Sequence, residues 1–161
     1  MENENYKLSG LVSYVLKDKN GNIKETREIP NLLTVTGKAN ISGLILVDTT
    51  SGLTPWDYIA IGTGSGQTKA STTLNAEITT NGGQRRGGAD VTGSVVTTTD
   101  AGDTAQLVTT YTFTNSFAVT ESGVFNNTYL NGGIMLCYQS YAAINVVSGD
   151  QLQITWKIKS A

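Results

Sequence analysis

The chain has 161 residues, of which only 15% are charged, and its net charge at pH 7 is −2. This balance argues against a nucleic-acid-binding protein, which would carry a clustered basic face. The sequence contains no histidine and a single cysteine, Cys137, so it lacks the commonest general base, the commonest metal ligand and any internal disulfide.

The length predicts one domain over residues 1–161. No apolar run reaches the roughly 20 residues that a membrane-spanning helix needs. The first six residues are polar and lack the apolar core of a signal peptide, which indicates no secretory export. We expect residues 1–6 to form a flexible N-terminal arm.

The first predicted element is a β-hairpin. Residues 6–17 alternate between apolar and polar side chains, as expected for a strand with one buried face. The Asn-Gly pair within residues 18–21 favours a tight turn, because both residues tolerate positive φ. The return strand, residues 23–29, is rich in charge, which predicts the edge of a sheet. Its charged residues are Lys24, Glu25, Arg27 and Glu28.

One short helix is predicted at residues 37–47, where apolar residues recur at helical spacing after Thr36, a candidate N-cap. A short strand at residues 56–61 then opens onto the glycine-rich loop 62–66. Gln67 stands where a dinucleotide-binding fingerprint needs its third glycine, so the loop is interpreted as a connection between strands.

The second half of the chain reads as strands and turns, after a connection at residues 81–88 that we expect to be flexible. In the last strand, QLQITWKIK, every second residue is apolar. The pattern of short strands with one early helix predicts a mainly β protein, an antiparallel β-sandwich, with a jelly roll as one such arrangement. The strands are expected near Val91 and Val95 and at 105–113, 117–125, 134–138, 142–147 and 151–159.

The order of several short segments resembles a family of small bacteriophage structural proteins. After the 11–29 hairpin, the matching segments are PNLLTVTG (30–37), YIAIGTG (58–64), TLNAEI (73–78), TESGVFN (120–126), GGIML (132–136) and QLQITWKI (151–158). Members of this family are virion accessory proteins of β-sandwich type. The resemblance spans nearly the whole chain and implies no catalytic residues.

The resemblance implies a virion protein that is assembled in the host cytoplasm. We expect a capsid decoration or cement protein, or a head-fibre protein, that binds the major capsid protein or other virion proteins as a homo-oligomer, with a trimer as the expected form. The alternative is a tail-associated adhesin or carbohydrate-binding module. A hydrolase is a weaker third hypothesis, because histidine is missing. No catalytic, cofactor-binding or metal-binding residue is predicted.

Two groups of residues are candidates for a special role. Glu121 lies within a predicted strand, so its carboxylate should be tied to a cation or to backbone N–H groups, and Arg85 or Arg86 is the candidate partner in a buried ion pair. The second group consists of aromatic residues that could form a subunit interface or a sugar-binding face. Its members are Trp56, Tyr58, Tyr129 and Tyr141.

Overall fold

The computed structural model describes residues 7–45, 54–130 and 132–160. The expected N-terminal arm at 1–6 and the last two positions of the expected helix lie outside the described residues. No helix in the described part of the chain is long and apolar enough to cross a membrane.

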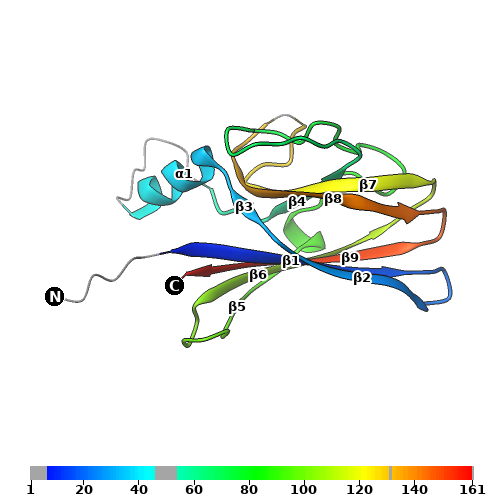
Figure 1. Ribbon diagram of the computed structural model, residues 1–161, viewed down its shortest axis with the longest axis horizontal. Helices are drawn as coiled ribbons and strands as arrows, with labels where there is room; N and C mark the ends of the chain where they lie inside the picture. The colour runs from blue at the N-terminus through cyan, green and yellow to red at the C-terminus, as the bar shows by residue number, and fades with distance from the viewer. Residues whose placement is uncertain (1–6, 46–53, 131, 161) are drawn as a thin grey trace.

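Two antiparallel sheets pack face to face, which confirms the predicted β-sandwich (Figure 1). Sheet 1 has the strand order β2-β1-β9-β6-β5, and sheet 2 has the order β3-β8-β7-β4. The strands of sheet 1 are β1 (Leu8–Lys17), β2 (Ile23–Pro30), β5 (Thr92–Val96), β6 (Thr104–Thr112) and β9 (Gln151–Ser160). Those of sheet 2 are β3 (Leu32–Leu33), β4 (Tyr58–Gly62), β7 (Phe117–Phe125) and β8 (Met135–Val146).

The last strand, β9, is the centre of sheet 1. It pairs with β1 on one side and with β6 on the other, so its backbone hydrogen-bonding groups are used on both edges. On its apolar face Leu152, Ile154 and Trp156 are each 0% exposed between the sheets, and Ile158 is partly buried. Apolar and polar residues alternate in this part of the sequence because one face of β9 lies in the core and the other faces outward.

The first hairpin forms where it is predicted. The backbone N–H of Gly21 donates to the carbonyl of Asp18 at 3.0 Å, and Gly21 has φ of 87°, a left-handed conformation that glycine adopts without strain. The charged return strand, β2, is indeed an edge of sheet 1. One prediction for later strands is wrong, because β8 runs without a break from Met135 to Val146.

The helix α1 (Val35–Ile45) begins two residues before the predicted start. Its N-cap is Thr34 rather than Thr36, because the Thr34 Oγ1 accepts a hydrogen bond from the N–H of Gly37 at 2.9 Å. The same hydroxyl is buried and donates to backbone carbonyls of β8. The helix is thereby anchored to the end of sheet 2.

A third layer covers the outer face of sheet 2 (Figure 1). It is formed by residues 63–87, which carry no helix or extended strand apart from isolated bridges to β4. Beneath this layer lies a small second apolar cluster, separate from the core between the sheets. Its buried members are Ala60, Leu74, Phe125, Met135 and Tyr138. Sheet 2 thus has apolar contacts on both faces, whereas no described segment covers the outer face of sheet 1 (Figure 1).

Candidate functional site

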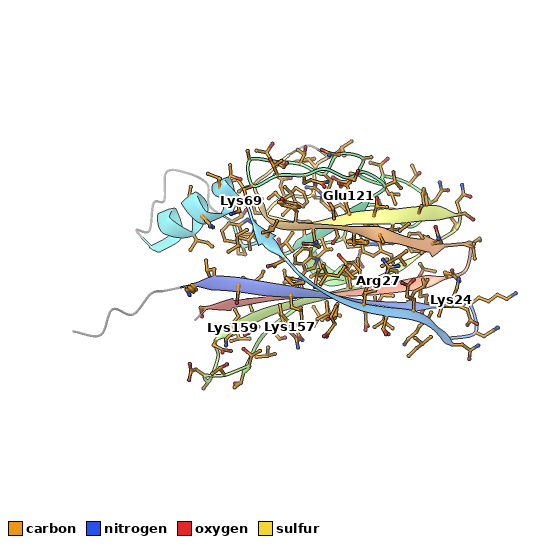
Figure 2. The ribbon with its side chains drawn as sticks, viewed as in Figure 1. Lys24, Arg27, Lys69, Glu121, Lys157 and Lys159 are labelled. Atoms are coloured by element: carbon orange, nitrogen blue, oxygen red, sulfur yellow. The ribbon has the colours of Figure 1, made fainter. Side chains whose placement is uncertain are left out.

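Glu121 is the central polar residue of the covering layer, and its position is labelled in Figure 2. It lies on β7, is 0% exposed, and points toward residues 63–87. Its Oε1 accepts hydrogen bonds from the backbone N–H groups of Gly64 at 3.0 Å and Ala76 at 2.8 Å, and its Oε2 accepts one from Asn75 at 3.1 Å. Three backbone donors thus take the place of water around a buried carboxylate.

The glycines of the loop explain how the backbone comes this close to the carboxylate. A Cβ atom on Gly62 would overlap Glu121 Oε1, and one on Gly64 would lie only 2.6 Å from the same oxygen. A side chain at either position would therefore push the loop away. The glycine-rich loop cradles an anion, but the anion is a side chain of the same protein and not a bound phosphate.

Arg85 is the second polar anchor of this layer. Its Nε and Nη2 bind the two carboxylate oxygens of Glu77 at 2.9 and 2.6 Å, and the two side chains are only 3% and 4% exposed. Its Nη1 donates to the carbonyls of Asn127 at 2.8 Å and Gly132 at 3.3 Å. The guanidinium carbon lies 3.9 Å from the centre of the Phe125 ring. This bidentate, stacked geometry ties the layer to the β7–β8 connection.

These contacts correct the predicted ion pair. Of the two kinds of partner expected for Glu121, a cation or backbone N–H groups, the structure shows backbone N–H groups. Arg85 pairs instead with Glu77. Arg86 lies 3.5 Å from Asp90, a residue that is largely exposed, and its backbone bridges to Ile59 of β4. The expected flexible connection at 81–88 therefore contributes a buried ion pair and a backbone bridge.

The four candidate aromatic residues do not come together on one surface. Trp56 and Tyr141 pack against the core between the sheets, and Tyr58 packs against the second cluster. The ring of Tyr141 lies 4.5 Å from that of Tyr14, and burial raises the pKa of its hydroxyl well above the usual value. Only Tyr129, 70% exposed, points to solvent. The described residues thus present no cluster of exposed rings among these four.

An apolar recess of about 450 Å³ lies at the end of the sandwich, near α1 and the β5–β6 hairpin. Its lining includes Trp56, Leu107 and Ile158, together with Val95 of β5. In residues 7–45, 54–130 and 132–160, no three side chains of the types that bind metal gather in one place.

The outer face of sheet 1 is the broad surface that remains. Cross-strand partners share a face, so the register identifies the outward residues. They are mostly Thr, Ser, Gln and Val, with three lysines and one glutamate. Lys157 and Lys159 follow this face in Figure 2. The outward residues are Ser9, Leu11, Ser13, Val15, Lys17, Ile23, Thr26, Glu28, Pro30, Thr92, Ser94, Val96, Thr104, Gln106, Val108, Thr110, Thr112, Gln151, Gln153, Thr155, Lys157 and Lys159.

Comparison with known proteins gives no relative: no protein-family model, curated protein or solved structure matches the chain. The resemblance to phage structural proteins therefore remains a prediction from the sequence.

Sequence reasoning missed Glu77 and the donors of the Glu121 cradle. A signal for Glu77 was present in the sequence, because it lies between the apolar residues Leu74 and Ile78. An acidic residue between buried apolar positions needs a strong partner, and Arg85 follows eight residues later. The three backbone donors left no comparable signal, since any residue type carries an N–H group.

Proposed function

We propose that the chain is a structural protein of a bacteriophage virion: a capsid decoration or cement protein, or a head-fibre protein, that binds the major capsid protein and stabilises the shell. The observation that carries the proposal is the bare outer face of sheet 1. A five-stranded face with few charges and many hydroxyl and amide groups suits a wet, hydrogen-bonded contact with another protein. We propose no catalytic role.

The shape of the molecule supports a mechanical role in this proposal. One face of the sandwich is closed by a layer that two buried charged anchors hold in place, and the other face is open. Many identical domains docking through such a face would bury surface across capsomer boundaries and so resist expansion of the shell. The packing of Trp56 and Tyr58 against apolar clusters is further support, because a sugar-binding platform needs exposed rings.

The first test is quantitative mass spectrometry of purified phage particles, with heads and tails separated. The proposal expects hundreds of copies per head. A few copies confined to tails would favour the adhesin, and absence from both fractions would refute the virion assignment.

The second test concerns the docking face itself. Val108 lies in the middle of the face, opposite Thr155 of β9 and Thr92 of β5. We expect Val108→Glu to reduce co-sedimentation with capsids that lack the protein. The matched control is Val147→Glu, because Val147 is an exposed valine in the β8–β9 turn, outside this face. Equal binding by both variants would exclude the outer face of sheet 1 as the contact.

One observation favours the alternative, a tail-associated adhesin or carbohydrate-binding module. Tyr129 and its neighbour Leu130 are exposed in the β7–β8 connection, where a sugar ring could stack on the tyrosine. This hypothesis expects specific binding on a glycan array that Tyr129→Ala abolishes. Specific glycan binding of this kind would count strongly against the capsid proposal.

A further inference from the structure

The sheet edges of this protein differ in how they are protected against further strand pairing. An unprotected edge presents free N–H and C=O groups to any extended chain. The β2 edge carries four charged residues and ends at Pro30. The β3 edge is two residues long. The β4 edge is capped by residues 63–87, whose backbone exchanges hydrogen bonds with Ile59 and Ile61 at 2.8–2.9 Å.

The remaining edge, β5, has none of these protections. It pairs with β6 on one side, and no other described strand pairs with its outer side. Its sequence, TGSVV, contains no charge and no proline, and four of its five residues are exposed. Val95 is 72% exposed although it is β-branched and apolar. The edge therefore lacks the charge, proline and cover that block further strand pairing.

We propose that β5 pairs with β5 of a second copy of this chain, antiparallel and around a two-fold axis at Ser94, so that two five-stranded sheets join into one. This register pairs the whole strand. It places Thr92 opposite Val96 of the second copy, Gly93 opposite Val95, and the two Ser94 residues opposite each other. The inference does not rest on the proposed function.

The strand is complementary to itself in this register. Gly93 and Val95 share the inward face with their β6 partners, Leu107 and Ala105. A Cβ atom on Gly93 would lie 3.6 Å from Leu107 Cδ2, so the glycine leaves open space beside an apolar side chain. Val95 of the second copy would fill that space on each side of the axis. The valine would thereby cover apolar surface of Leu107 that the glycine leaves uncovered.

The pairing makes a small interface with a defined symmetry. Because the same strand lies on both sides, the contact is isologous and closes at two copies. A trimer, the form expected from the sequence, would need β5 to pair with a different edge, and the β2 edge is charged. Five residue pairs place the interface at the low end of specific interfaces, so we expect association that depends on concentration.

Sedimentation velocity of the full chain, from about 1 µM to about 1 mM, tests the association. The proposal expects a species of about 34 kDa, twice the 17.0 kDa of one chain, at the higher concentrations. Val95→Lys should raise the dimer dissociation constant about tenfold or more, because it brings a charge onto an edge where the strands pair. The matched control is Ile23→Lys on the β2 edge, an apolar residue that is 63% exposed and should leave the dissociation constant unchanged.

Both side chains are largely exposed, so both variants should keep the thermal unfolding midpoint of the monomer. A monomer throughout the concentration range, a trimer, or a dimer that Val95→Lys does not weaken would each overturn the proposal.

Disulfide trapping tests the register. The two Ser94 residues would have Cα atoms about 4.5–5.5 Å apart, within disulfide range, so Ser94→Cys should give a covalent dimer under oxidation. Thr92→Cys is the control, because its two copies would lie about four residues apart along the strands and should not cross-link. Cys137 is fully buried and does not compete. Cross-linking at Thr92→Cys in preference to Ser94→Cys would refute the register.

Discussion

Replacing Glu121 by glutamine is the sharpest test of the anchored layer. The substitution keeps the size of the side chain and removes its charge and one of its acceptor oxygens. If the remaining oxygen takes the place of Oε1, the hydrogen bonds from Gly64 and Ala76 persist. The new NH₂ group then faces the N–H of Asn75, which had donated to Oε2, and two donors oppose each other.

The size of the effect follows from these three contacts. Loss of one charge-assisted hydrogen bond costs about 1.5–3 kcal/mol, and the two that remain become weaker neutral bonds. The neutral side chain recovers part of this loss because it no longer needs a charge to be desolvated. We therefore expect Glu121→Gln to lower the free energy of unfolding by about 2–3 kcal/mol.

Urea unfolding measures this change, and hydrogen exchange locates it. Exchange should accelerate at the amides of Gly64, Asn75 and Ala76 before it changes in sheet 1. Glu28→Gln, on the exposed β2 edge, is the control and should change stability by less than about 0.5 kcal/mol. A loss below about 0.5 kcal/mol in Glu121→Gln, with the three amides unchanged, would refute the view that the carboxylate holds the layer.

Three further predictions concern other anchors. Trp156→Ala should cost about 3–5 kcal/mol in urea unfolding because β9 is central and Trp156 is fully buried; a loss under about 1 kcal/mol would contradict this packing. Arg85→Ala should cost about 3–5 kcal/mol, since it leaves Glu77 charged and buried, whereas Arg86→Ala, whose partner Asp90 is exposed, should cost less than about 1 kcal/mol; equal losses would argue against the buried pair. Burial alone would raise the pKa of Asp103, but hydrogen bonds from the amides of Thr98, Thr99 and Asp100 lower it well below its usual range. Its contribution to stability is thus complete above about pH 5 and is lost as the pH falls, so Asp103→Asn should flatten the acid side of the stability curve, and an unchanged slope would contradict this.

The fold class could be predicted from the sequence because the alternation of apolar and polar residues shows which face of each strand is buried. Alternation in β9 and a hairpin turn after β1 depend on neighbouring residues only, and both are confirmed. The Asn-Gly pair does not form the predicted two-residue turn, because only Gly21 has positive φ and residues 18–22 separate the two strands. The charge of β2 likewise identified an edge. Strand order could not be predicted, because pairing of β9 with β1 and β6 depends on residues far apart in the chain.

For Glu121, the sequence predicts burial but does not predict the partner. Burial of Glu121 followed from the apolar residues around it, and so did its need for a partner. Which partner it has depends on how residues 63–87 return over sheet 2, and a tertiary path of this kind leaves no periodic signal. The same reason explains the wrong N-cap prediction, Thr36, because the contact of Thr34 with β8 is also a tertiary contact.

Pairing of the first strand with the last has a consequence for synthesis. Leu8 pairs with Ser160, 152 positions later, so sheet 1 lacks its central strand until residues 151–160 have left the ribosome. Until then, the β1–β2 hairpin exposes the apolar face that it will later bury, and nascent chains are open to aggregation. Closing so long a loop is also slow. Sheet 1 of this protein is therefore expected to form only after β9 has emerged from the ribosome.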